Sequence, residues 1–158
     1  MSIDLSVFHS AAPYRGFKDA DWKILSEVLV EKSLKAGDLV FKENDPGDGF
    51  YWIRSGKIRI SRKVVAEGKK EAQEQLLTVL TAGNIFGEMA LVESEPRSAD
   101  AKAEDNAVLF YLSKAIYGRL QKDEPNTALR IQDVLVVLLC SRLREANRSF
   151  EVIRFLIT

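Results

Sequence analysis

The sequence predicts a mainly β fold with flanking helices, in which the strands form a closed or rolled antiparallel sheet. Residues 34–112 contain short runs rich in Val, Ile, Phe, Tyr and Trp, separated by turn-forming residues. On both sides of this region the apolar residues have helical spacing. The length of 158 residues is that of one ordinary domain. We therefore expect a single domain, with N-terminal helices at 1–33, strands at 34–112, and C-terminal helices and a tail at 113–158.

The first element expected in this order is a short helix near residues 19–29. Asp19 is a candidate N-cap, and the apolar residues that follow it have helical spacing: Trp22, Leu25, Val28 and Leu29. In the β region, Ser55 and Gly56 separate two strand candidates, 50–54 and 57–63. This two-residue spacing predicts a hairpin. The polar segment 67–75 predicts the exposed tip of a second hairpin.

Helical patterning returns after the strands. Ser113 is expected to cap a short helix that ends near residue 121, and a long helix is expected over 126–147. The long helix is apolar nearly all round, which predicts burial on more than one face. We expect one face to cover the sheet and the other to meet a second copy of the chain in a homodimer. The apolar tail 149–158 is expected to pack against another surface.

The composition excludes several kinds of function. The chain carries 23 basic and 23 acidic residues, so no overall charge draws it to nucleic acid or to an anionic membrane. Its only cysteine, Cys140, is expected to be a small buried apolar residue, and its only histidine, His9, has no catalytic partner nearby in sequence. No secretory signal and no apolar run long enough to span a bilayer is seen. These features predict a cytoplasmic protein without a metal and without enzymatic activity.

Residues 86–99 contain three features that favour anion binding. Residues 86–91 read as a strand end, a glycine turn and the first turn of a short helix, and backbone amides near Met89 and Ala90 would face an anion there. Gly87 has no side chain, so a ligand can approach the backbone closely. Arg97 offers a planar fork that matches two phosphate oxygens. The segment therefore predicts a phosphate site.

A carboxylate beside this phosphate site indicates a second polar group on the ligand. Glu88 can accept a hydrogen bond from a hydroxyl, and the ribose 2′-OH of a nucleotide is such a donor. With Arg97 on the phosphate and Glu88 on the sugar, a cyclic nucleotide would be oriented within a β-walled pocket.

On these residues the chain resembles the cyclic nucleotide-binding domain family, which includes catabolite activator protein and the regulatory subunits of cAMP-dependent protein kinase. The resemblance covers about residues 17–147. It is strongest in residues 86–91 and 96–99, including the nine-residue step from Glu88 to Arg97, and extends to the glycine turns at 35–38, 45–48 and 55–56. It implies a double-stranded antiparallel β-roll, similar to a jelly roll, with an N-terminal helix and C-terminal helices.

The resemblance also implies the ligand and the residues that hold it. In the family the arginine binds the cyclic phosphate and the glutamate binds the ribose hydroxyl. Members that prefer cGMP often carry Thr at the position of Ser98, so we expect cAMP, with cGMP as the alternative. The family's long helix caps the base, which makes Arg142 and Asn147 candidates, although an ordinary exposed position is the alternative for each. The full set of expected site residues is Phe86, Gly87, Glu88, Met89, Ala90, Arg97, Ser98, Ala99, Arg142 and Asn147.

Three hypotheses about function follow. The leading one is a regulatory sensor, in which cyclic nucleotide binding moves the helices after Ser113 and signals to an unknown effector protein. The second is a structural or assembly domain with an unoccupied pocket. The third is the sensor fragment of a transcription regulator. Because only about ten residues follow the long helix, no direct DNA binding is expected for this chain.

Overall fold

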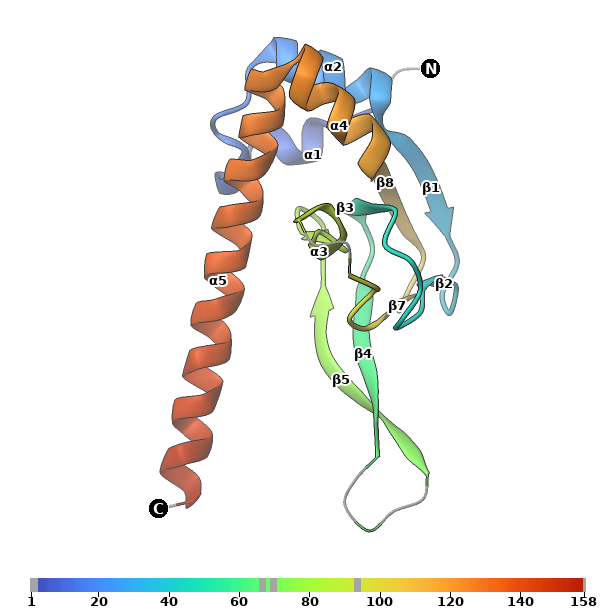
Figure 1. Ribbon diagram of the computed structural model, residues 1–158, viewed down its shortest axis with the longest axis vertical. Helices are drawn as coiled ribbons and strands as arrows, with labels where there is room; N and C mark the ends of the chain where they lie inside the picture. The colour runs from blue at the N-terminus through green and yellow to red at the C-terminus, as the bar shows by residue number, and fades with distance from the viewer. Residues whose placement is uncertain (1–2, 66–67, 69–70, 93–94, 158) are drawn as a thin grey trace.

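The computed structural model describes residues 3–65, 68, 71–92 and 95–157, and the side chains of residues 90, 92 and 150–157 are outside that description. Figure 1 shows two β-sheets with helices gathered at one end and one long helix running down the side. The helical elements are α1 (Ser6–His9), the 3-10 helix η1 (Ala12–Tyr14), α2 (Asp19–Val28), α3 (Met89–Val92), α4 (Lys114–Asp123) and α5 (Pro125–Ile157). The predicted mainly β fold with flanking helices is confirmed.

The strands form two four-stranded antiparallel sheets. One sheet has the order β1-β8-β3-β6, and the other has the order β2-β7-β4-β5. The strands are β1 (Val30–Leu34), β2 (Leu39–Phe41), β3 (Gly49–Ser55), β4 (Ile58–Val65), β5 (Ala72–Leu80), β6 (Ile85–Phe86), β7 (Asp100–Ala103) and β8 (Ala107–Ser113). The first strand therefore begins at Val30, within the region predicted to be helical.

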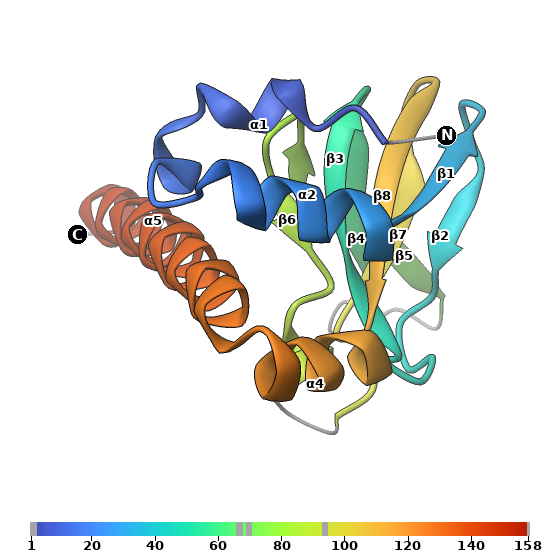
Figure 2. The same cartoon turned by 90° about the horizontal axis from the view of Figure 1, so that it is seen from above.

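In the sheet that contains β3, this strand is buried on both faces. Because side chains alternate along a strand, Phe50 and Trp52 point to the helices, while Tyr51 and Ile53 point to the second sheet. Each face contributes to a separate apolar cluster. The first cluster joins this sheet to the N-terminal helices, α4 and α5, and the second fills the interior of the roll. Figure 2, seen from above, shows α1 and α2 lying across the strands.

The turn at Ser55 and Gly56 is not a hairpin, so that prediction is wrong. β3 and β4 belong to different sheets, and the turn carries the chain from one sheet to the other. Gly56 has φ +83°, and a Cβ at this position would lie 2.5 Å from the backbone oxygen of Asn106. The glycine signal marked a close approach between backbones at a corner, which sequence spacing alone does not distinguish from a hairpin. The second predicted hairpin is present between β4 and β5, but its tip is shorter than the predicted 67–75, because residues 72–75 pair with β4 as part of β5. Residues 66, 67, 69 and 70 are outside the described residues.

The N-terminus of α2 is joined to α5 by a buried carboxylate. Lys18, not Asp19, occupies the N-cap, and its N–H donates to Asp21 Oδ2 at 2.7 Å. Asp21 Oδ1 accepts from Thr127 Oγ1 at 2.6 Å and from Arg130 Nη1 at 3.1 Å. Arg130 Nε also donates to the carbonyl oxygen of Gly16 at 2.6 Å. This set of contacts, which we name the Asp21 junction, fixes the first turns of α5 to the N-terminal helices.

The C-terminal helices follow the prediction at their start and differ at their end. Ser113 caps α4, with its hydroxyl accepting from Ile116 N at 3.2 Å. α5 continues to Ile157 rather than ending near residue 147. Ile131 and Val134 are buried against the core, whereas Cys140 is exposed. The expectation of a buried cysteine is therefore wrong for this chain, because α5 runs past the core at that point (Figure 1).

The tail expected to pack, residues 149–158, continues α5 up to Ile157, but its apolar side chains are outside the described residues. Among the described residues, no helix combines the length and the apolar character needed to cross a bilayer.

Candidate functional site

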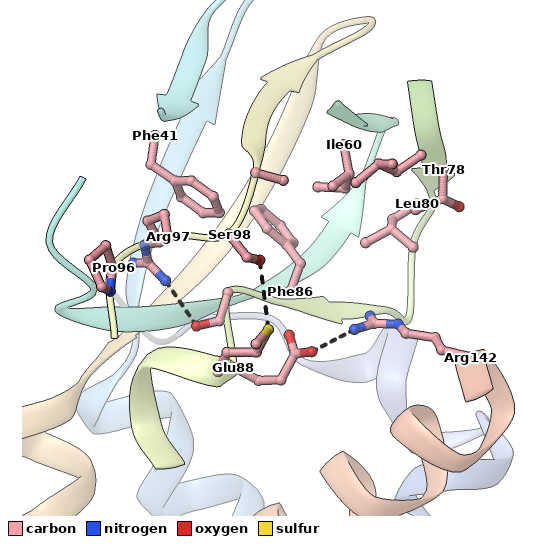
Figure 3. A pocket seen from close by; sticks show the side chains of 14 residues that line it. Phe41, Ile60, Thr78, Leu80, Phe86, Glu88, Pro96, Arg97, Ser98 and Arg142 are labelled. Carbon is pink, nitrogen blue, oxygen red and sulfur yellow. Dashed lines mark hydrogen bonds and ion pairs between the residues drawn. The ribbon is translucent and has the colours of Figure 1, made fainter. Parts of the chain in front are cut away.

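A cavity of about 220 Å³ lies at the end of the roll, between β5, α3 and the side of α5. Figure 3 shows the polar side chains of Arg97, Ser98, Glu88 and Arg142 on one side of it and apolar side chains on the other. Its lining consists of Phe41, Ile60, Leu77, Thr78, Leu80, Phe86, Gly87, Glu88, Met89, Pro96, Arg97, Ser98, Ala99 and Arg142. The cavity thus brings together residues from positions 41 to 142 of the chain.

The local structure of residues 85–92 matches the sequence interpretation. β6 ends at Phe86, Gly87 makes the turn with φ +75°, and α3 begins at Met89. A Cβ on Gly87 would lie 2.7 Å from Arg97 Nη1. Glycine is therefore required by the position of the arginine as well as by the turn. The turn brings the main chain and the guanidinium together at one wall of the cavity.

Arg97 is a buried cation, with a side chain that is only 4% exposed. Nη1 donates to the carbonyl oxygen of Gly87 at 2.8 Å, and Nη2 donates to Asp48 Oδ1 at 3.2 Å. Nε makes no hydrogen bond with any residue that the structure describes. Because a buried guanidinium nitrogen without a partner is costly, this side chain is suited to an incoming anion.

Two tyrosines surround the partner of Arg97. The Tyr111 hydroxyl donates to the carbonyl oxygen of Asp48 at 3.1 Å. Burial raises the pKa of Tyr111 to about 12, with the charge of Asp48 adding to the shift. Burial likewise raises the pKa of Tyr51. Both phenols are therefore neutral at neutral pH, and Asp48 supplies the negative charge next to Arg97.

Glu88 also lines the cavity and is 8% exposed. Its Oε1 accepts a hydrogen bond from Arg142 Nη1 at 2.8 Å, and Arg142 Nη2 donates to the carbonyl oxygen of Ile85. Arg142 reaches this wall from α5, as Figure 3 shows. It is therefore not an ordinary exposed helix residue, which was the alternative interpretation from sequence. Oε2 of Glu88 accepts no hydrogen bond from any residue that the structure describes, so it can accept from another donor.

The remaining expected site residues are not all in the cavity. Ser98 and Met89 line it, with Ser98 Oγ 3.6 Å from Met89 Sδ. Asn147 is exposed on α5 and lines neither this cavity nor a second one. The side chain of Ala90 is outside the described residues.

A second cavity, of about 350 Å³, continues between β5 and α5. It shares four lining residues with the first: Leu77, Thr78, Leu80 and Arg142. The outer end of a ligand in the first cavity would therefore contact α5.

Sequence reasoning did not find the apolar wall of the site. Phe41 comes from β2, Ile60 from β4, and Leu77, Thr78 and Leu80 from β5. The signal that could have found them is strand alternation around the predicted second hairpin, since inward-facing residues near a glycine turn tend to line the interior of a roll. Asp48 was visible only as part of a turn, with no indication that its carboxylate meets Arg97.

Comparisons with known proteins agree with this geometry. The family model described as cyclic nucleotide-binding domain matches residues 31–123. The cyclic AMP receptor protein of Thermus thermophilus is 34% identical over 149 residues, which cover 94% of this chain and 62% of that protein. The cAMP-dependent protein kinase regulatory subunit of Debaryomyces hansenii is 34% identical over 96 residues, covering 61% of this chain and 19% of that protein.

A solved structure shows the same fold. The crystal structure of Thermus thermophilus catabolite activator protein superposes with a TM-score of 0.73 and 28% identity, covering 92% of this chain and 64% of that one. This chain spans less than two thirds of the length of each of these three relatives. The matched region contains the whole roll and the cavity residues up to Ala99. The chain therefore belongs to the cyclic nucleotide-binding domain family, a family of regulatory domains.

Proposed function

We propose that the chain is a cAMP-binding sensor that holds the nucleotide in the cavity between Arg97 and Glu88. The observation that carries this proposal is the buried Arg97, whose Nε has no partner among the described residues and which lines the same cavity as the buried Glu88. A buried cation and a buried anion at one cavity match a ligand with an anionic end and a hydroxyl-bearing end. A cyclic nucleotide has both.

The anionic end is the cyclic phosphate. Arg97 binds it through its guanidinium edge, and the Ser98 hydroxyl and the first backbone amides of α3 lie at the same wall. No net charge of the protein assists, since acidic and basic residues balance. Affinity for the phosphate therefore depends on these local donors.

The hydroxyl-bearing end is the ribose. Glu88 Oε2 accepts from the 2′-OH while Oε1 keeps its bond to Arg142. The base then extends past Thr78 and Leu80 toward α5, where the second cavity continues. We assign adenine as the preferred base because Ser98 stands where cGMP-preferring relatives often carry Thr.

The regulatory output is a change in the position of α5. Ligand bound to Glu88 is held next to Arg142, so it stabilises one placement of α5 against the roll and shifts the equilibrium toward it. The relatives that match include a transcription regulator and a kinase regulatory subunit, which supports an effector that acts downstream of this movement. We propose no catalytic step for this chain.

Calorimetry tests the binding proposal. We expect cAMP to bind the wild type more tightly than cGMP, and Arg97→Met to lose at least about 2 kcal/mol of binding, or roughly thirtyfold, because charge-assisted hydrogen bonds to the phosphate are lost. Arg59→Met is the matched control, since Arg59 is paired with Glu104 at 3.4 Å and does not line the cavity. No measurable heat from the wild type at high micromolar cAMP, or equal binding by Arg97→Met, would reject the proposal.

A second role, homodimerisation through α5, is supported by its exposed apolar residues. Leu129, Val136 and Leu143 are 55%, 58% and 62% exposed and are spaced seven residues apart, as in a coiled-coil seam. We expect light scattering to give twice the chain mass for the wild type and the monomer mass for Val136→Glu. Arg144→Glu, a charge change at an exposed position of the same helix outside the a and d positions of this repeat, is the control. A monomeric wild type would contradict the dimer, and a dimer that binds no nucleotide would favour the assembly hypothesis.

A further inference from the structure

The Arg97 guanidinium lies over the face of the Phe41 ring. The carbon atom Cζ of Arg97 is 4.3 Å from the centroid of the Phe41 ring. Phe41 is the last residue of β2, and its side chain lines the cavity (Figure 3). A cation this close to an aromatic face, and away from water, interacts favourably with the ring. The ring and the guanidinium are therefore in direct contact within the proposed ligand site.

The hydrogen bonds of Arg97 do not fix the tilt of its guanidinium plane, which the Phe41 ring can restrain. Nη1 and Nη2 are held by Gly87 O and Asp48 Oδ1, both at the outer edge of the guanidinium. Asp48 is 73% exposed, so its side chain is a weak restraint. Two bonds at one edge permit the plane to tilt about the line that joins them. The Phe41 ring opposes that tilt because it is in direct contact with the guanidinium.

Phe41 is itself held by neighbouring rings inside the roll. Its ring centroid is 6.0 Å from that of Tyr51 and 5.9 Å from that of Phe86, and those two rings are stacked at 5.1 Å. The three residues come from β2, β3 and β6. The fixed aromatic cluster thus gives the guanidinium a rigid surface.

We propose that Phe41 is a positioning residue that sets the plane of Arg97 and thereby determines which of the two exocyclic phosphate oxygens the arginine holds. This inference rests on the proposed function, because it concerns the phosphate of a bound cyclic nucleotide. The two exocyclic oxygens are stereochemically distinct, so a guanidinium of fixed plane meets them differently. A guanidinium free to tilt discriminates less between them.

The test compares cAMP with the Sp and Rp isomers of its cyclic phosphorothioate, in which sulfur replaces one or the other oxygen. We expect Phe41→Leu to bind cAMP about tenfold more weakly and to bring the ratio of the two isomers' dissociation constants close to one. Phe41→Tyr keeps the ring and should retain most of the wild-type ratio. Ile60→Ala is the matched control: it removes apolar surface from the same cavity, so it should weaken binding while leaving the isomer ratio unchanged.

A second measurement needs no ligand. The Arg97 Nε–H signal in a ¹⁵N relaxation experiment should show greater mobility in Phe41→Leu than in the wild type or Ile60→Ala. If Arg97 is equally ordered in all three proteins, the inference is wrong even where cAMP binds. If Phe41→Leu and Ile60→Ala change the isomer ratio alike, it is also wrong. Failure of the wild type to bind cAMP rejects the proposed function, whereas the relaxation result judges the role of Phe41 separately.

Discussion

Asp21 and Arg97 are both buried charged residues, but they differ in how many of their hydrogen bonds are made within the chain. Asp21, which is 3% exposed, receives donors on both oxygens from Lys18, Thr127 and Arg130. Arg97, which is 5% exposed, bonds to Gly87 and to the exposed Asp48 and keeps Nε without a partner among the described residues. The hydrogen bonds of Asp21 are thus all made within the chain. Arg97, at the wall of a cavity, keeps one donor without a partner among the described residues.

The difference separates a structural charge from a ligand-binding one. A buried ion whose hydrogen-bonding groups are all used holds parts of the chain together, here α2 and α5. A buried ion with a free donor facing a cavity gains that bond only when ligand arrives. Loss of Asp21 should therefore affect unfolding most, and loss of Arg97 should affect binding most.

The largest expected effect is on stability at the Asp21 junction. Asp21→Ala should lower the free energy of unfolding by about 3 kcal/mol, because it leaves the Thr127 hydroxyl and the Arg130 guanidinium without their acceptor in a buried place. Denaturant unfolding measures this. Asp19→Ala, on the exposed side of the same helical turn, should change the same quantity by less than about 1 kcal/mol. Equal effects of the two variants would show that the junction is not structural.

Arg97→Met should affect ligand binding strongly and the free energy of unfolding only slightly. Its free energy of unfolding without ligand should stay within about 1 kcal/mol of the wild type, since replacing a buried ion by an apolar side chain of similar size is often neutral and Asp48 remains solvated. At a cAMP concentration of 100 times the wild-type Kd, the wild type should gain about 2.7 kcal/mol and a variant that binds thirtyfold more weakly at most about 0.9 kcal/mol. A variant as unstable as Asp21→Ala would remove the distinction between the two charges.

The smallest of the three expected effects is that of replacing Arg142, which, like Asp21, pairs with another charged residue and, like Arg97, lines the cavity. It bonds to Glu88 at 2.8 Å but is 31% exposed. Arg142→Ala should weaken cAMP binding about tenfold, or roughly 1.4 kcal/mol, because Glu88 loses the partner that orients it. The control is Arg144→Ala, an exposed position on the same helix. Tighter binding by Arg142→Ala would mean that the arginine competes with the ribose instead of positioning its acceptor.

The sequence predicted the parts of the molecule that depend on neighbouring residues. Residues 86–91 fold as expected because a strand end, a glycine turn and a helix start are local features, and Ser113 caps α4 for the same reason. Errors occurred where distant segments meet. The partner of Gly56 is Asn106, and two of the partners of Asp21, Thr127 and Arg130, lie more than 100 residues away. No local spacing encodes those contacts.

Two further errors arise from the same cause. Cys140 lies in an apolar stretch of sequence that is typical of a core, but its burial depends on what lies beside α5, and no residue that the structure describes covers it. Phe41 has the pattern of an ordinary strand residue, yet its neighbour is Arg97, which is brought there by the return of the chain after α3. Chemistry at a site can be recognised from its polar residues, whereas the apolar surfaces that orient them are visible only after folding.

The anchoring of α5 at one end makes the helix a lever. Arg142 lies 12 residues beyond Arg130 and Ile157 lies 27 residues beyond it, which at 1.5 Å per residue places them about 18 Å and about 40 Å from the Asp21 junction. A tilt of about 6° around that junction displaces Arg142 by about 2 Å, enough to break its bond to Glu88, and displaces the far end of the helix by about 4 Å. A displacement of Arg142 that breaks one hydrogen bond to the roll is thus accompanied by a displacement about twice as large at the far end of α5.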